Sequence, residues 1–154
     1  MTDIVIKTAI NQLEYDFDDF SLEHFIFHVK KLRQREIILL PTVLAFEISA
    51  LWVKREIEDY IFYNTAQHDI HQTHSILHEI AHIVLDHSCV PVNDILPKEL
   101  LAMLQNGKIM GRPRMPKTLL QDDPEEQAAE SFVYLIQEQI IDTNRLEHLT
   151  TQGS

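Results

Sequence analysis

The residues best suited to metal binding and catalysis are His78, Glu79 and His82, which form the pattern His-Glu-x-x-His. In a helix, residues four apart lie on one face with Cβ atoms about 5–6 Å apart, so both imidazoles can bind one metal ion. Glu79 projects beside them, where its carboxylate can deprotonate a water molecule that attacks a peptide carbonyl. The pattern therefore predicts a zinc peptidase site, with His78 and His82 as metal ligands and Glu79 as the catalytic base.

The surrounding sequence favours a metal site over unrelated histidines. The chain contains nine His residues, so the bare pattern can arise by chance. Apolar residues recur around it at helical spacing, which predicts a largely buried helix. These residues are Leu77, Ile80, Ala81 and Val84. Two histidines and a glutamate on a buried helix need polar partners, and a metal ion supplies them.

Residues close to the motif have less certain roles. His87 follows His82 by five residues and lies about half a turn from His78 on a continuous helix, a poor position for a third ligand. A metzincin has Gly at position 85 and His at position 88, which are Leu and Ser here. Asp86 either hydrogen-bonds a ligand imidazole or faces solvent. His74 either faces the substrate carbonyl oxygen or simply begins the helix.

Two further groups complete the set of candidate polar residues. His24 and His28 are four apart, but no carboxylate lies between them, so we expect them on a solvated helix surface. An additional donor to the developing oxyanion is expected. The candidates for that donor, which the sequence does not rank, are His74, Tyr63 and Tyr134.

The composition limits both architecture and partners. A chain of 154 residues with 45% hydrophobic and 24% charged residues suits one globular domain, predicted over 1–150. Its net charge of −11 argues against direct nucleic-acid binding. No apolar run is long enough for a membrane span. The single cysteine, Cys89, cannot form an internal disulfide, and no secretory segment is evident, so we expect a cytoplasmic protein.

Three short apolar segments before the motif predict strands, at 37–40, 48–53 and 60–63. Together with the helices, they predict an α+β fold with a small, mostly antiparallel three-stranded sheet. The strand at 60–63 is expected to border the cleft, where its edge could pair with an extended substrate backbone. After the motif, 98–104 is predicted to be helical, and a mobile loop is expected around 105–122.

A second helix is predicted to begin at Asp123. Asp123 is a suitable N-cap, Pro124 suits the first helical position, and Glu126 could close a capping box. A catalytic zinc site with two histidines needs a third protein ligand. A carboxylate from a following helix is one known solution, so Glu126 has both a structural and a metal-binding explanation.

The chain resembles the ImmA/IrrE metallopeptidases over about residues 37–140. The resemblance lies in the motif helix, the strand before it and the segment Glu126-Gln127-Ala128-Ala129-Glu130-Ser131-Phe132. The resemblance implies that Glu126 is the third zinc ligand and that Ala129 and Phe132 are packing residues. Glu130 stands where the family usually has Asn or Asp, and Val133 where Ala is common, so Glu125 remains an alternative ligand.

The resemblance also implies a gluzincin-like, zincin-like minidomain with a central motif helix and a following Glu-bearing helix. It implies zinc-dependent endoproteolysis of a specific partner protein, typically a helix-turn-helix transcriptional repressor. A second hypothesis is a metal-binding interaction module, or a toxin–antitoxin component, that binds a regulator without cutting it. A third is a zinc-stabilised structural domain, which is disfavoured because a closed structural site needs four protein ligands. Two imidazoles and a carboxylate also suit Fe²⁺ and Mn²⁺.

Overall fold

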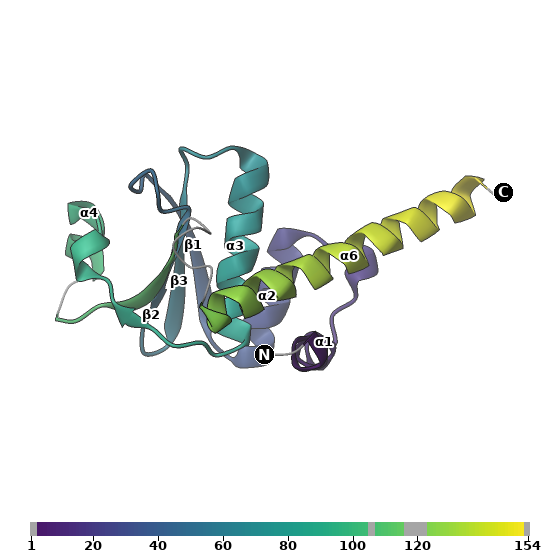
Figure 1. Ribbon diagram of the computed structural model, residues 1–154, viewed down its shortest axis with the longest axis horizontal. Helices are drawn as coiled ribbons and strands as arrows, with labels where there is room; N and C mark the ends of the chain where they lie inside the picture. The colour runs from purple at the N-terminus through teal and green to yellow at the C-terminus, as the bar shows by residue number, and fades with distance from the viewer. Residues whose placement is uncertain (1–2, 105–106, 116–122, 153–154) are drawn as a thin grey trace.

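The computed structural model describes residues 3–104, 107–115 and 123–152, with side chains described as far as residue 141. These residues form an α+β fold of five α-helices and a five-stranded mixed sheet (Figure 1). The helices are α1 (Asp3–Gln12), α2 (Leu22–Arg33), α3 (Asp69–Val84), α4 (Lys98–Leu104) and α6 (Pro124–Gln152). The strands are β1 (Glu36–Thr42), β2 (Ala50–Lys54), β3 (Glu58–Asn64), β4 (Val90–Pro91) and β5 (Met110–Arg114). Two 3₁₀ turns lie at Phe17–Asp19 and Asn93–Ile95.

The sheet has the strand order β1-β3-β2-β5-β4. β1 and β3 are parallel, and all the other neighbouring strands are antiparallel. The three predicted strands are confirmed as β1, β2 and β3, but the prediction of a three-stranded sheet is wrong, because β4 and β5 extend it. β5 lies within the range 105–122 that was predicted to be a mobile loop. Residues 105–106 and 116–122 of that range lie outside the described residues.

The position of β3 corrects the prediction for the cleft edge. β3 pairs with β1 on one side and β2 on the other, so its segment Tyr60–Tyr63 has no open edge. The strand beside the predicted site is β5 instead. β4 pairs only with Met110 and Gly111, so the outer edge of β5 from Arg112 to Arg114 has no strand partner within the described parts of the chain.

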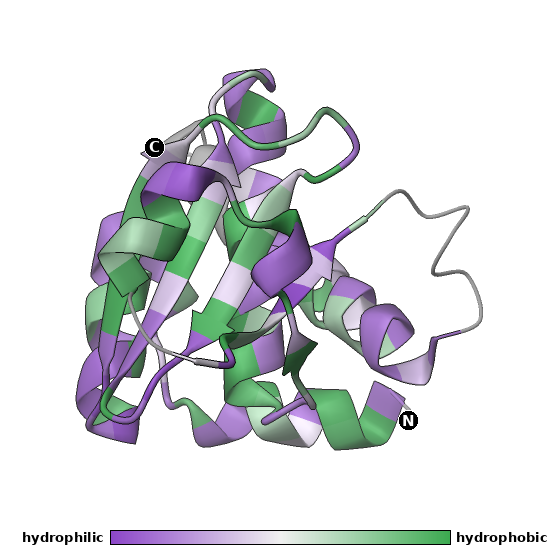
Figure 2. Ribbon diagram, turned by 90° about the vertical axis from the view of Figure 1, so that its left-hand side faces the viewer, coloured by the Kyte–Doolittle hydropathy of each residue, from purple (hydrophilic) through white to green (hydrophobic). Residues whose placement is uncertain are grey.

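Two apolar cores lie on opposite faces of the sheet. On one face, Trp52 and Ile61 pack with the buried sides of α1, α2, α3 and α6. On the other face, Leu51 and Phe62 pack with α4 and the segments around it. Figure 1 shows α3 and α4 on opposite sides of the sheet, and Figure 2 shows hydrophobic and hydrophilic residues interspersed along the strands. The alternation of side chains along each strand produces both cores.

Two of the helices, α2 and α6, begin at side chains well suited to an N-cap. The Ser21 side chain accepts a hydrogen bond from the His24 backbone N–H at the start of α2. The Asp123 side chain accepts from the backbone N–H groups of Glu125 and Glu126 at the start of α6, with Pro124 as the first helical residue. The N-caps satisfy amide groups that have no partner within the helix. None of the helices, as far as their residues are described, has the length and hydrophobicity needed to cross a membrane.

Candidate metal centre

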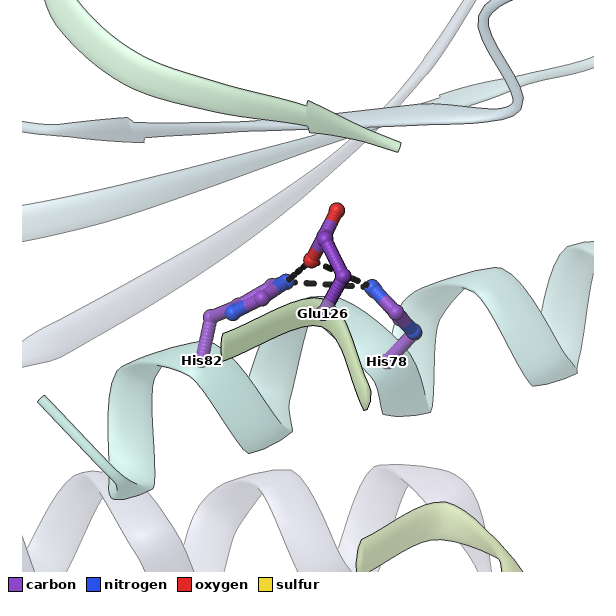
Figure 3. A group of neighbouring side chains, drawn as sticks. All are labelled: His78, His82 and Glu126. Atoms are coloured by element: carbon purple, nitrogen blue, oxygen red, sulfur yellow. Dashed lines mark hydrogen bonds and ion pairs between the residues drawn. The ribbon is translucent and has the colours of Figure 1, made fainter. Parts of the chain in front are cut away.

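Three buried side chains from two helices converge on one point. His78 and His82 project from the same face of α3, and Glu126 reaches them from the first turn of α6 (Figure 3). Glu126 Oε2 lies 2.5 Å from His82 Nε2 and 3.2 Å from His78 Nε2, and the two Nε2 atoms are 3.0 Å apart. The three side chains form a group that could hold a metal ion.

The donor set fits a tetrahedral zinc ion. Bonds of about 2.0–2.1 Å in tetrahedral geometry separate ligand atoms by about 3.3 Å. The His78–Glu126 and His78–His82 separations are close to this value, and the His82–Glu126 separation needs to open by less than 1 Å. Three protein ligands leave one tetrahedral position for water or substrate, which is the pattern of catalytic zinc sites.

The geometry distinguishes Glu126 from its neighbour Glu125. The Glu125 carboxylate accepts hydrogen bonds from the backbone N–H and the hydroxyl of Ser88 and from Arg112. These contacts direct the Glu125 carboxylate to Ser88 and Arg112 rather than to the histidine pair. The Glu126 side chain contacts both imidazoles, so its main role is in this group rather than in a capping box.

The Glu79 carboxylate lies in the protein interior without a hydrogen bond from any described residue. Its side chain is fully buried, and neither carboxylate oxygen has a hydrogen-bond partner among the described residues. Burial raises the pKa of the Glu79 carboxyl to about 8, although the charge of His78 opposes this. An unsatisfied buried carboxyl is unfavourable unless something binds it. A water molecule held at the neighbouring metal group would satisfy it, and a pKa near neutrality suits a general base.

Glu130 provides an outer carboxylate for His78. Glu130 Oε1 lies 2.7 Å from His78 Nδ1, and its Oε2 lies 3.1 Å from His74 Nε2. Arg114 of β5 donates a hydrogen bond to the same carboxylate. Such an outer carboxylate orients a metal-binding imidazole and increases its basicity. His74 is thus held by Glu130, and the structure gives no contact that favours it as an oxyanion donor.

His87 provides the outer partner of His82. The two Nδ1 atoms are 2.7 Å apart, and the Trp52 indole stacks on the face of the His82 ring. His87 reaches this position because the helix ends: Asp86 adopts φ 56°, and the His87 N–H bonds back to the His82 carbonyl oxygen. Asp86 itself is exposed and lies 3.7 Å from Lys54, so it faces solvent.

Arg112 of β5 ties the sheet to the metal group. Its Nε lies 3.3 Å from Glu126, its Nη1 lies 3.0 Å from Glu125, and its Nη2 lies 2.8 Å from Asp123. The Arg112 side chain is only 11% exposed. It therefore fixes the first turn of α6 against β5 and orients the Glu126 carboxylate. The sequence analysis missed this role, because the carboxylates that Arg112 contacts come from another part of the chain and only the fold brings them together.

The remaining oxyanion candidates are not brought to the group by any described contact. Tyr63 is half-buried and packs against the helix-side core. Tyr134 is 62% exposed on α6. His24 is exposed on α2, as predicted, and His28 is half-buried. Both rings contact Tyr15, and His28 Nε2 lies 2.5 Å from the Leu13 carbonyl oxygen. These two rings help to fasten α2 to the segment before it.

The buried ligands have strongly shifted pKa values. Burial lowers the pKa of His78, but hydrogen bonds with Glu126 and Glu130 outweigh this and raise it to about 9. Burial lowers the pKa of His82 to about 4, with partial opposition from Glu126. Burial raises the pKa of Glu126, but hydrogen bonds with both imidazoles hold it well below its usual range. The metal-free group therefore carries a proton on His78 at pH 7.

We expect zinc affinity to increase with pH because zinc must displace the proton on His78. The folded metal-free protein keeps this proton up to about pH 9. With one proton displaced, the apparent association constant rises about tenfold per pH unit from 7 towards 9 and then levels off. Competition with a chromogenic chelator at several pH values measures this slope. A flat profile from pH 7 to 9 would contradict the assigned state of His78.

No protein-family model matches the chain, and neither a curated protein nor a solved structure is significantly similar to it. The resemblance to the ImmA/IrrE metallopeptidases therefore stays a prediction, and the site has to be interpreted from its own geometry.

Proposed function

We propose that this protein is a zinc-dependent endopeptidase that cleaves a specific partner protein. The observation that supports this proposal is the convergence of His78, His82 and Glu126 next to the buried and unpaired Glu79. A structural metal site would need a fourth protein ligand, and the described residues place no further Cys, His or carboxylate in this group. The open position and the adjacent base are what hydrolysis requires.

The residues divide the chemistry between them. His78, His82 and Glu126 would hold a zinc ion, which would supply Lewis-acid polarisation of the scissile carbonyl and would lower the pKa of water towards 7. Glu79 accepts a proton from the attacking water as the new C–O bond forms. Glu79 then passes this proton to the amine nitrogen as the C–N bond breaks. The open edge of β5 lies beside α3 and is suited to hold an extended substrate backbone.

We further propose that the substrate is a helix-turn-helix repressor and that the protein acts in the cytoplasm. The ImmA/IrrE resemblance of the motif helix and the Glu126 segment supports the substrate class. The net charge of −11 supports contact with a protein rather than with DNA. The single cysteine supports a reducing compartment.

The same group of residues is also compatible with a different role. The Glu126 carboxylate already pairs with two imidazoles and with Arg112, so the group is well satisfied as it stands. A metal-binding module, or a toxin–antitoxin component that holds a regulator without cutting it, would have the same features. Such a module would keep its biological effect without Glu79.

The test is to incubate the purified, zinc-loaded protein with an extract of its source cells and to identify new protein N-termini by mass spectrometry. We expect a small set of new N-termini that disappears with a chelator and returns when zinc is added. If the N-termini are the same with the zinc-loaded protein, with the chelator and after zinc is added back, the result would contradict endopeptidase activity and favour the binding module.

A further inference from the structure

A cavity of about 490 Å³ lies where α3 begins and β5 ends, beside the loop that precedes β2. Its lining is rich in aromatic rings and other polarisable groups, on Phe46, His68, His71, Arg114 and Met115. Phe46 is 93% exposed, and the rings of His68 and His71 pack edge to face with their centroids 6.5 Å apart. The metal-binding side chains and Glu79 do not line this cavity, so it is distinct from the metal group.

Arg114 connects the cavity with the metal group. Its Nη1 donates to the hydroxyl of Ser75 at 3.3 Å, and Ser75 lies one helical turn before Glu79 on α3. Its Nη2 lies 3.0 Å from the Glu130 carboxylate, which in turn contacts His78. The residue that forms the inner wall of the cavity therefore also contacts the surroundings of the metal group.

The cavity lies about three residues of an extended chain from the metal group. His71 and His78 are seven residues apart on α3, so they lie on nearly the same face and about 10 Å apart along the helix axis. An extended peptide advances about 3.3 Å per residue. A substrate that reaches the metal group can therefore place a side chain of the same segment in the cavity.

The pairing of β5 gives the direction of such a segment. Arg112 contacts Glu126 at the metal group, and Arg114, two residues further along β5, lines the cavity. β4 runs antiparallel to β5 along the same edge, from the level of Gly111 to that of Met110. A substrate on the open part of this edge, in the direction of β4, has its N-terminal side at Arg114. The cavity then receives a residue before the scissile bond.

We propose that this cavity binds an aromatic side chain of the substrate, about three residues before the scissile bond. This inference rests on the proposed endopeptidase function. The rings of Phe46, His68 and His71 offer edge-to-face contacts to an aromatic ring. Met115 offers a sulfur–aromatic contact, and the planar guanidinium of Arg114 offers a stacking surface. An aliphatic side chain of similar size gains only dispersion contacts from the same groups.

Charged side chains fit the cavity less well. The Arg114 side chain is only 19% exposed and is paired with Glu130, so its charge is already neutralised. The carboxylate of Glu47 lines the same cavity and repels an acidic side chain. A basic side chain would approach the Arg114 guanidinium. An uncharged aromatic ring avoids both repulsions and uses the rings around it.

Cleavage of a peptide library by the zinc-loaded full chain tests the proposal. The library is a digest of cell extract, and mass spectrometry identifies the cleaved bonds. We expect Phe, Tyr and Trp to be enriched at one position, two to four residues before the cleaved bond. Phe46→Ala should lower the aromatic-to-aliphatic ratio at this position about threefold to tenfold. Val43→Ala is the matched control, because Val43 is 75% exposed on the same loop but does not line the cavity.

A binding measurement tests the cavity separately from cleavage. The probes are the tripeptides acetyl-Phe-Ala-Ala and acetyl-Leu-Ala-Ala, whose carboxylate can occupy the open metal position while the first side chain reaches the cavity. Isothermal titration of the zinc-loaded protein should show the Phe tripeptide binding about threefold to tenfold more tightly than the Leu tripeptide. Phe46→Ala should remove this difference, and Val43→Ala should retain it.

The two measurements separate the cavity from the proposed function. Cleavage without aromatic enrichment before the bond, or equal affinity for the two tripeptides, would overturn the assignment of the cavity and leave the endopeptidase proposal standing. Tighter binding of the Phe tripeptide without any cleavage would support the cavity and contradict the endopeptidase proposal.

Discussion

Replacing Glu79 with Gln is expected to reduce peptide-bond cleavage by about 10²–10⁴-fold, the usual contribution of a general base. Gln has the same shape but cannot accept the proton of the attacking water. Glu79 makes no hydrogen bond with a described residue, so the substitution breaks no hydrogen bond within the described protein. It should therefore leave both the fold and the zinc content intact.

The new N-termini formed in cell extract, counted for Glu79→Gln beside wild type, measure this effect. Glu138→Gln is the matched control, because Glu138 is an exposed carboxylate on α6 whose replacement should have little effect on stability. Zinc content and thermal unfolding should be the same in all three proteins. Unimpaired cleavage by a zinc-loaded Glu79→Gln protein would rule out the proposed base.

Replacing Arg112 with Met is expected to lower the free energy of unfolding by about 3–5 kcal/mol, the usual effect of removing one partner from a buried ion pair. Arg112 neutralises Asp123, Glu125 and Glu126 at the start of α6 and donates to the Ser88 carbonyl oxygen. Without it, three carboxylates repel one another and one of them is buried. The N-terminus of α6 should then separate from β5.

Urea denaturation of the zinc-free proteins measures this loss. Lys108→Met is the matched control: Lys108 is an exposed cation before the same strand, and its loss should change stability by less than about 0.5 kcal/mol. Arg112→Met should also bind zinc more weakly, since Glu126 loses its orientation. Equal stability of Arg112→Met and Lys108→Met would contradict the buried ion-pair cluster.

Local signals were sufficient for the parts of the fold that depend on nearby residues. Capping by Ser21 and Asp123, and the apolar runs that became β1 and β3, act over a few residues and were predictable. β5 was not, because Gly111 and Pro113 are poor strand formers and the strand exists through its pairing with β2. Gly111 is required there: a Cβ would lie 2.2 Å from the Trp52 carbonyl oxygen.

In the candidate site, too, the features set by nearby residues were predictable and those set by tertiary structure were not. The spacing of His78, Glu79 and His82 and the start of α6 are local, so the three-residue group could be anticipated. The role of His87 depends on the positive φ of Asp86, a conformation that a helical projection does not contain. The partners of Arg112 come from a strand and a helix, and only tertiary structure brings them together.

The most direct test of the central claim is the zinc content of the purified protein, measured by mass spectrometry for wild type and three alanine variants. We predict about one zinc per chain in wild type and in Glu125→Ala, none in His82→Ala, and a weakened, chelator-sensitive site in Glu126→Ala. Wild-type protein without zinc, even after zinc is added, would contradict the claim. Equal loss in Glu125→Ala and Glu126→Ala would contradict the assignment of the third ligand.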